Sequence, residues 1–517
     1  MKMLRSILSS ISLLALLPSL GAAAQPPAPT AAACEALAGL TLPAMQVTLA
    51  RAYAADEFTP PAQGGGGPPG GGAAAAAAPR VTTPAFCRVA ATLKPSADSA
   101  IRTEFWLPMS GWNGNYVGVG NGGTAGSIVY SAMVTTLAQG YALANNDTGH
   151  EGGSAEFAID HPEKMIDYAY RANHEMTLRA KAIIAKFYGR APARSLWVGC
   201  SLGGLQGLIE ASRYAADYDG IVAGAPPNPL SLFNAEQIYG PWLNLNHPEG
   251  TIPTPKFAMI HQAALKACGT PVGLAQGFIE DPERCHFDPG ALLCKSGDAG
   301  DCLTAPQVQR LRDLYRGPVD PRTGKVIFPG PAVGAESQFE AGGGVTPLQP
   351  PVDLYRYMVY KDRNWDWKSL DYAASVDKAI QTIDPLLRVG DNLNAFLGRG
   401  GKLLLYVGWT EGHNAADLVN YYQGLVRNVG AAKADNVRLF LVPGMNHCGG
   451  GAGCDTFEKA GTLDGWVSSG KAPDQIASSK VVAGQVIRTR PLCAWPMVAR
   501  YRGTGSMDEA ASFECRR

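Results

Sequence analysis

Short apolar runs alternate with stretches of helical periodicity over the first half of the chain. Helical patterns are present at 129–139 and at 168–187. A third helical pattern places Leu205, Leu208 and Ile209 on one face. Apolar runs between these segments predict buried strands at 90–93, 101–107, 116–119, 141–144, 196–198 and 220–224. Alternation of this kind predicts the α/β class, with a parallel sheet that is covered by helices on both faces.

The pattern changes at Pro226 and Pro227. Residues 228–395 contain the closely spaced cysteines and few strand–helix units, which predicts an inserted domain. The alternation then returns, with a strand at 403–407, a helix at 418–429 and a strand at 437–442. A sheet interrupted by an insertion indicates an α/β-hydrolase fold with a lid. We therefore predict a core formed by residues 25–227 and 396–517, and a lid at 228–395.

The first 24 residues have the pattern of a signal peptide. Lys2 and Arg5 provide a basic start, residues 7–20 are apolar but short for a bilayer span, and residues 22–24 are three alanines. This pattern predicts cleavage near Ala24 and a mature protein that is secreted or periplasmic.

Composition narrows the possible partners. Lys and Arg number 44, as do Asp and Glu, so neither nucleic acid nor a membrane surface is expected as a partner. Residues 25–80 contain few structural signals, and 62–78 is a Gly-, Ala- and Pro-rich loop of low complexity. Export predicts that the eleven cysteines form disulfides rather than a zinc site, and the odd number leaves at least one unpaired.

A candidate nucleophile follows the strand at 196–198. Ser201 lies in Gly199-Cys200-Ser201-Leu202-Gly203, between that strand and a helix. A sharp turn of this kind exposes the hydroxyl above the sheet, and the following helix N-terminus favours developing negative charge. Alone, the pattern also fits an ordinary Gly-rich turn.

A candidate base follows the last predicted strand. Of the eight histidines, His447 lies in a loop downstream of Ser201, which is the order serine, acid, histidine of α/β hydrolases. Cysteines adjoin both candidates, since Cys200 precedes the serine and Cys448 follows the histidine. A disulfide between them would close a long loop, worth about 4–5 kcal/mol in the chain-entropy model, and would hold the two catalytic groups together.

These motifs resemble the tannase and feruloyl esterase family, which also contains hydrolases of mono(2-hydroxyethyl) terephthalate. The resemblance extends over nearly the whole chain from about Cys34. Its motifs are Gly199-Cys200-Ser201-x-Gly203-Gly204, Asn446-His447-Cys448, Trp112-Asn113-Gly114, Gly118-Val119-Gly120-Asn121-Gly122-Gly123 and Asp147-Thr148-Gly149-His150. The resemblance implies an α/β-hydrolase core, a lid that shapes the substrate pocket, and a serine esterase mechanism.

The resemblance also implies disulfide pairings. They are Cys200–Cys448, Cys34–Cys87, Cys268–Cys285, Cys294–Cys302 and Cys493–Cys515. Cys454 is then left unpaired.

The chain departs from the family pattern in three respects. Leu202 replaces the usual threonine, although its backbone N–H can still serve an oxyanion. Glu411 stands where the family has the triad aspartate, with Asp417 as the runner-up. The loop between Cys268 and Cys285 lacks the family's calcium-binding aspartates, with Gly269, Val272 and Gln276 in their places, so no metal is expected there.

The resemblance points to further site residues. The oxyanion hole is expected to combine the Leu202 N–H with that of Gly122 or Gly123. Candidate substrate-stacking residues in the lid are Tyr239, Trp242, Trp365 and Trp367, and simple packing of these side chains is an equal alternative.

The sequence thus favours an exported carboxylesterase for esters of aromatic acids that needs no cofactor. Ser201 would be the nucleophile, His447 the base and Glu411 the orienting acid. Two alternatives remain: a hydrolase fold that serves only as a binding protein, and an acyltransferase with the same triad. The sequence does not choose among feruloyl, galloyl and terephthaloyl esters, and gives no oligomeric state.

Overall fold

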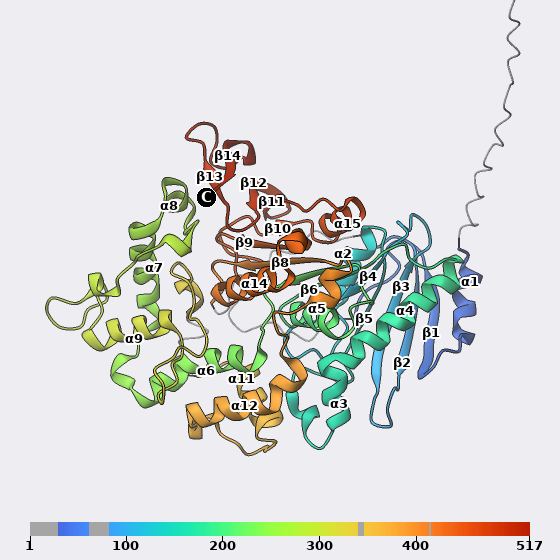
Figure 1. Cartoon of the computed structure of the whole chain (residues 1–517), viewed down its shortest axis with the longest axis horizontal. Coiled ribbons are helices and arrows are strands. Elements are labelled where there is room, and N and C mark those ends of the chain that lie inside the picture. Colours follow the sequence, from blue (N-terminus) through green and yellow to red (C-terminus); the bar gives the residue numbers. More distant parts are fainter. Residues whose placement is uncertain (1–28, 62–81, 340–345, 413–414) are drawn as a thin grey trace, which may run out of the picture.

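The computed structural model describes residues 29–61, 82–339, 346–412 and 415–517 and is built on a nine-stranded sheet (Figure 1). The predicted signal peptide and the low-complexity loop at 62–78 lie outside the described residues. The strand order is β1-β2-β3-β5-β4-β6-β7-β8-β9. The strands are β1 (Met45–Tyr53), β2 (Phe86–Leu93), β3 (Ile101–Pro108), β4 (Tyr116–Val119), β5 (Ala142–Asn146), β6 (Ser195–Cys200), β7 (Gly220–Gly224), β8 (Lys402–Gly408) and β9 (Val437–Val442).

The sheet is mixed, so the expectation of a parallel sheet is wrong at one edge. Strands β1, β2 and β3 pair antiparallel with their neighbours, and β3 pairs antiparallel with β5. The pairs from β5 through β4, β6, β7, β8 and β9 are parallel. Strands β2 and β3 follow one another without a crossover helix, which permits only antiparallel pairing.

Strand β1 was missed, because residues 25–80 appeared poor in structural signals. Its side chains are half-buried or exposed, so the strand has no strong apolar alternation. It pairs with β2 from Met45 opposite Leu93 to Tyr53 opposite Phe86. The Cys34–Cys87 disulfide ties β2 to the short helix α1 (Ala31–Glu35).

Helices cover both faces of the sheet, as predicted. On one face α4 (Ala172–Tyr188), α5 (Leu202–Arg213) and α14 (Ala415–Val429) pack into the larger apolar core. On the other, α2 (Tyr130–Ala138) and α15 (Ala460–Ser469) pack into a second core. A short helix, α3 (Pro162–Ile166), and a π-helical turn (Asp167–Arg171) precede α4.

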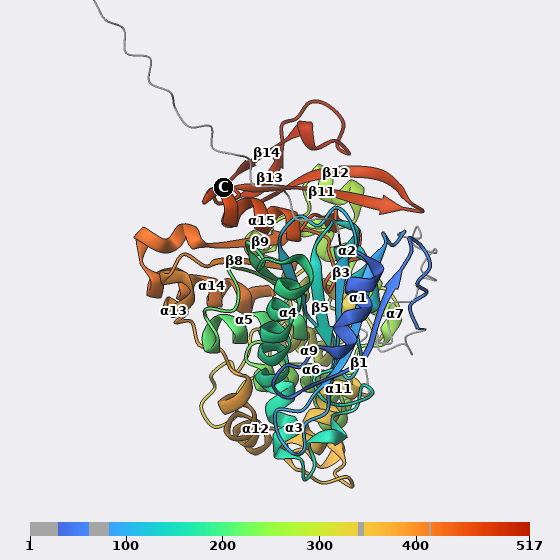
Figure 2. The same cartoon turned by 90° about the vertical axis from the view of Figure 1, so that its right-hand side faces the viewer.

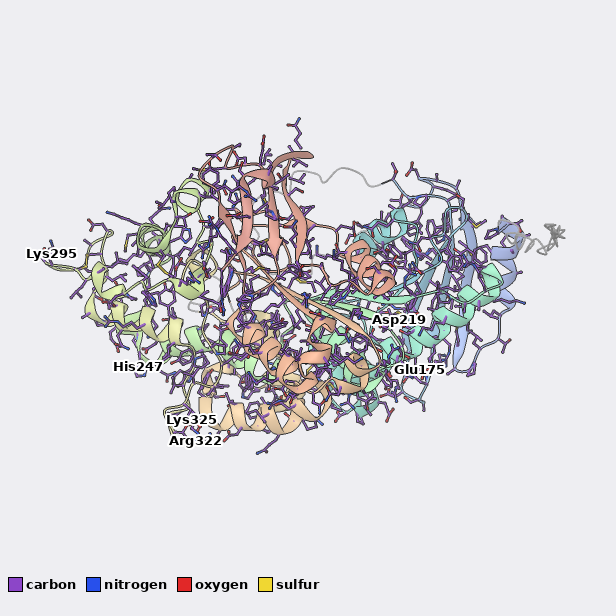
Figure 3. All side chains as sticks on the ribbon, turned by 45° about the horizontal axis from the view of Figure 1, so that its top comes forward. Glu175, Asp219, His247, Lys295, Arg322 and Lys325 are labelled. Atoms are coloured by element: carbon purple, nitrogen blue, oxygen red, sulfur yellow. A yellow bond between two sulfur atoms is a disulfide. The ribbon has the colours of Figure 1, made fainter. Side chains whose placement is uncertain are left out.

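A helical segment is inserted between β7 and β8, where the lid is predicted. It projects to one side of the sheet, and Lys295, Arg322 and Lys325 lie on its outer surface (Figures 1 and 3). Two disulfides close loops within it, Cys268–Cys285 and Cys294–Cys302. Its α-helices are α6 (Leu230–Asn246), α7 (Thr254–Cys268), α8 (Pro271–Gln276), α9 (Ala305–Arg316), α11 (Gln349–Asp353), α12 (Tyr372–Leu387) and α13 (Asn394–Gly398). The exact bounds of 228 and 395 stay a prediction.

The chain ends in two small sheets that the sequence did not predict (Figure 2). Strands β10 (Thr456–Phe457), β11 (Gln475–Val482) and β12 (Gln485–Cys493) form one, and β13 (Val498–Tyr501) and β14 (Phe513–Arg516) form the other. The Cys493–Cys515 disulfide joins β12 to β14. Much of β11 and β12 is exposed, so their sequence lacks the apolar run of a buried strand.

Candidate active site

Ser201 lies at the sharp turn between β6 and α5. Its φ of 60° and ψ of −128° are strained for a residue with a side chain, a conformation that costs about 1–3 kcal/mol. The turn is possible because small residues surround it: a Cβ at Gly199 would lie 2.2 Å from the Gly203 carbonyl oxygen. This backbone has the geometry of the nucleophile elbow that the sequence predicted.

His447 and Glu411 are held next to each other by the ends of two neighbouring parallel strands. Glu411 follows β8 and His447 follows β9, and Nδ1 of His447 lies 2.6 Å from Oε1 of Glu411. The Glu411 side chain is 1% exposed, whereas that of His447 is 35% exposed. If Nδ1–H donates to the carboxylate, Nε2 carries the lone pair that a general base needs.

Backbone contacts fix the Glu411 loop against the His447 loop. The Thr410 N–H donates to the Met445 carbonyl, and the Trp409 N–H donates to the Val442 carbonyl. A Cβ at Gly408 would lie 2.0 Å from the Met445 carbonyl oxygen, so only glycine allows this approach. The acid and the histidine are therefore positioned by main-chain contacts and not by their own hydrogen bond alone.

The Cys200–Cys448 disulfide joins the serine turn to the histidine loop. Its Cα atoms are 5.9 Å apart although the residues are separated by 248 positions. Since consecutive Cα atoms lie about 3.8 Å apart, the Cα atoms of Ser201 and His447 lie within about 14 Å of each other. All five disulfides implied by the resemblance are present, and Cys454 is unpaired and buried.

Asp417, the runner-up acid, occupies the first turn of α14. Burial raises its pKa to about 7, so near neutral pH the carboxyl group is ionised only in part. A carboxyl group of this kind stabilises an imidazolium poorly. The geometry thus brings Glu411, rather than Asp417, to His447.

The Gly120–Gly123 loop lies against the start of α5. The Gly203 N–H donates to the Asn121 carbonyl at 2.7 Å, and a Cβ at Gly120 would lie 2.6 Å from the Gly203 Cα. Among the described residues, the N–H groups of Leu202, Gly122 and Gly123 have no hydrogen-bond acceptor. These three groups are therefore available to an oxyanion.

Two buried side-chain amides hold the Gly120–Gly123 loop in place. No motif in the sequence indicates them. Oε1 of Gln206 accepts from the Asn121 N–H at 3.0 Å, and Nε2 of Gln206 donates to the Asn121 side-chain oxygen at 3.1 Å. The Asn121 amide also donates to the Asn146 carbonyl at 2.8 Å. Gln206 and Asn121 are 1% and 3% exposed, so these bonds fix the loop on α5.

The lid aromatics pack mainly against each other. Trp365 stacks on Tyr360 with ring centroids 5.1 Å apart, and Trp242 packs on Tyr372 at 5.2 Å. Tyr239 also packs on Tyr372, whereas Trp367 is half-buried against the core. These contacts fit the packing alternative left open by the sequence.

Side chains of the loop between Cys268 and Cys285 are engaged by other parts of the protein. Val272 packs in an apolar cluster, and Gln276 bonds to the Met507 carbonyl and to Arg490. Of its three acidic residues, Glu280 accepts from the Thr270 hydroxyl, Asp281 pairs with Arg500, and Glu283 accepts from Nε1 of Trp495. Because calcium requires six or more oxygen ligands, the loss of the family's calcium site stays a prediction.

Comparison with known proteins agrees with this architecture. An uncharacterized esterase from Xanthomonas campestris pv. campestris is 33% identical, covering 94% of this chain and 92% of the relative. A probable feruloyl esterase B from Aspergillus clavatus is 31% identical over 83% of this chain and 86% of its own length. The crystal structure of feruloyl esterase B from Aspergillus oryzae superposes with a TM-score of 0.83 at 26% identity, covering 94% of this chain and 100% of that one.

The fold and the serine turn define an α/β hydrolase with an inserted lid, which confirms the predicted fold class. The family model described as tannase and feruloyl esterase matches residues 87–516. The chain belongs to the tannase and feruloyl esterase family, and it is accordingly a carboxylic ester hydrolase.

The cysteine chemistry fits an extracellular protein. Five disulfides are typical of chains that mature in an oxidising compartment. Within the described ranges, no helix has the length and apolar character needed to cross a membrane.

Proposed function

We propose that this protein is an exported serine esterase that hydrolyses esters of aromatic acids through an acyl-enzyme. The observation that carries the proposal is the 2.6 Å contact between Glu411 and His447, on a loop that a disulfide ties to the Ser201 turn. A nucleophile, a base and an orienting acid are the three groups that such a mechanism needs.

In the first half-reaction, Oγ of Ser201 attacks the ester carbonyl carbon while Nε2 of His447 takes the hydroxyl proton. The carbonyl oxygen becomes negative and accepts hydrogen bonds from the N–H of Leu202 and from Gly122 or Gly123. Glu411 stabilises the imidazolium that forms. The intermediate then collapses, the C–O bond to the alcohol breaks, and His447 returns the proton to the departing alcohol.

In the second half-reaction, water replaces the alcohol. His447 takes a proton from water as its oxygen attacks the acyl carbon, and the tetrahedral intermediate forms in the same oxyanion site. Collapse releases the carboxylic acid and returns the proton to Oγ of Ser201. No step draws on a metal or an organic cofactor, so we propose that none is required.

The substrate class rests on the relatives. Proteins named feruloyl esterase B are similar to this chain along most of its length, and the family also includes tannases. We therefore place the substrates among esters of hydroxycinnamic, gallic and terephthalic-type acids. Nucleic acid and membranes are not expected as partners, because the chain is balanced in charge.

Export is part of the proposal. Residues 1–24 have the basic start, apolar stretch and small residues of a signal peptide, and we expect cleavage near Ala24. The disulfides would then form in the periplasm or outside the cell.

The test is hydrolysis of a panel of feruloyl, galloyl and 2-hydroxyethyl terephthaloyl esters by the wild-type protein and by Ser201→Ala. We expect the wild type to release at least one aromatic acid and the variant to be slower by about 10⁴-fold or more. Equal rates for the two proteins would refute the serine mechanism. Release of new esters, but no acid, when an alcohol is added would instead support the acyltransferase.

A further inference from the structure

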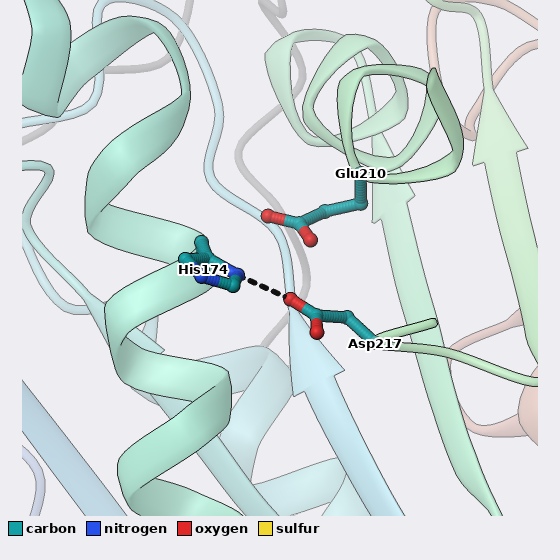
Figure 4. Close-up of side chains that lie close together, drawn as sticks. All are labelled: His174, Glu210 and Asp217. Carbon is teal, nitrogen blue, oxygen red and sulfur yellow. Dashed lines mark hydrogen bonds and ion pairs between the residues drawn. The ribbon is translucent and has the colours of Figure 1, made fainter. Parts of the chain in front are cut away.

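Three potential metal ligands meet far from the proposed catalytic residues. His174 lies on α4, Glu210 on α5, and Asp217 in the turn that precedes β7 (Figure 4). Helix α5 begins beside Ser201, and Glu210 lies eight residues further along, about 12 Å at 1.5 Å per residue. The cluster is thus near the amino-terminal edge of the parallel strands, whereas Ser201 lies at their carboxyl ends.

The three side chains converge closely. Nδ1 of His174 lies 2.6 Å from Oδ2 of Asp217. One ligand atom from each residue lies within 4.8 Å of the other two. Two ligands held about 2.0–2.2 Å from one tetrahedral zinc ion lie about 3.3–3.6 Å apart, so Nδ1 of His174 and Oδ2 of Asp217 must separate by less than about 1 Å to bind the ion.

The environment of Glu210 is a second observation, independent of the ligand distances, that indicates a cation in this cluster. It is 1% exposed and its carboxylate is directed toward the other two residues (Figure 4). Neither of its oxygens has a hydrogen-bond partner among the described residues. A buried carboxylate without a partner is costly, so it must be balanced by a cation or neutralised by a proton.

Lys181, which contacts the main chain of Asp217, does not complete the site. Nζ of Lys181 donates to the main-chain carbonyl of Asp217 rather than to the Glu210 carboxylate. The Glu210 oxygens therefore remain open to a cation that approaches past His174, whose side chain is 23% exposed.

We propose that His174, Glu210 and Asp217 form a structural binding site for a divalent transition metal ion of the zinc type. One imidazole nitrogen with two carboxylates is a donor set that suits such an ion, and water can fill a fourth position. Binding displaces the proton from between Nδ1 and Asp217 to solvent. The sequence predicted no metal site, because the ligands come from three separate elements with no motif spacing.

The bound ion connects three elements. They are helix α4, helix α5, which follows the nucleophile, and the turn before β7. An ion that binds the folded state and not the unfolded chain stabilises the fold by mass action. The site stabilises the fold and takes no part in ester hydrolysis. A test of the metal site is therefore independent of a test of the proposed function.

The experiment uses the full-length mature protein, stripped with a chelator, dialysed and titrated with zinc chloride. Bound zinc is counted by elemental analysis after desalting, and Tm is recorded with and without the ion. We expect one zinc per wild-type chain and a rise in Tm. Glu210→Gln, which keeps the shape of the side chain, and His174→Ala should each lose both effects.

His161→Gln is the matched control, because His161 pairs with Asp98 in an exposed position. It should bind zinc as the wild type does. Equal zinc binding and Tm shift in Glu210→Gln and wild type would overturn the site, as would a wild type that retains no zinc. A Tm rise that is the same with calcium would overturn its assignment to a transition metal.

Discussion

Oε1 of Glu411 accepts a hydrogen bond from Nδ1 of His447 at 2.6 Å, in a site where the glutamate is 1% exposed and the histidine 35% exposed. The family pattern places an aspartate at the position of Glu411. The glutamate nevertheless reaches the histidine, and main-chain bonds from Trp409 and Thr410 join the ends of β8 and β9 that carry the two residues. Burial excludes water from the carboxylate and so strengthens its interaction with an imidazolium.

The acid is tested by two amide substitutions. Glu411→Gln removes the charge that stabilises the imidazolium, and we expect kcat to fall by about 10³–10⁴-fold with a smaller change in KM. Asp417→Asn serves as the matched control, because its kcat should remain within about tenfold of wild type. Steady-state kinetics on a feruloyl ester measures both. A larger loss in Asp417→Asn would assign the role of acid to Asp417.

Asp417 should make stability depend on pH. Its pKa is about 7 in the folded protein, above the ordinary 3.8, so the folded state disfavours the ionised form. The contribution of the protonated Asp417 carboxyl group to the free energy of unfolding is fully present below about pH 4. This contribution is lost as pH rises to 7, because the group ionises more easily in the unfolded chain. Asp417→Asn should therefore gain stability relative to wild type over this range, by at least about 1 kcal/mol.

Urea denaturation of both proteins at pH 4, 5.5, 7 and 8 measures this difference. We expect it to grow up to pH 7 and then to level off. A difference that stays constant across the range would show that the carboxyl group titrates normally.

The Cys200–Cys448 disulfide should affect both stability and activity. Replacing both cysteines with alanine releases a loop of 248 residues, for which the chain-entropy model gives about 5 kcal/mol. We also expect kcat to fall, since the serine and histidine loops lose their covalent connection. The matched control is Cys294→Ala with Cys302→Ala, which opens a separation of only 8 residues in the lid.

Denaturant unfolding and kinetics on the two double variants separate these effects. The lid variant should lose less stability and keep most of its kcat. If both variants keep the wild-type kcat, the disulfide between the two loops is not needed to position the catalytic groups.

The Gly120 loop should tolerate no side chain at its contact with α5. In Gly120→Ala the new Cβ would meet the Gly203 Cα at 2.6 Å, so the loop must move by several tenths of an ångström. We expect kcat to fall by about 10²-fold, as when one oxyanion donor is lost, with little change in KM.

Gly153→Ala is the control, because its Cβ would have no atom within 4 Å. A Gly120→Ala enzyme with the kcat of wild type would show that this loop does not supply an oxyanion donor. Gln206→Leu, which removes the bonds to Asn121, is expected to lower kcat less than Gly120→Ala does.

Much of the core could be predicted because its strands are short buried apolar runs. The run at 437–442 coincides with β9, and the run at 403–407 lies inside β8. Strand β1 could not be predicted, since it lies at the sheet edge with half-exposed side chains. The short connection between β2 and β3 already requires antiparallel pairing, whereas the pairing of β3 with β5 depends on the strand order, which periodicity does not encode.

The candidate site likewise contains residues that the sequence could predict and residues that it could not. Ser201 and His447 lie in local motifs, and the disulfide partners follow from the family resemblance. The brace between Gln206 and Asn121 depends on side-chain geometry across residues far apart in the sequence. A buried amide pair leaves no spacing signal, and neither does the cluster of His174, Glu210 and Asp217.

The measurement that tests the central claim most directly is detection of the acyl group on the nucleophile. The wild-type protein is mixed with a feruloyl ester, quenched in acid within the first turnovers, digested and analysed by mass spectrometry. We predict a feruloyl group on the peptide that contains Ser201, and its absence from the same peptide of Ser201→Ala. An active enzyme with the acyl group on another residue, or on none under any quench time, would contradict the account.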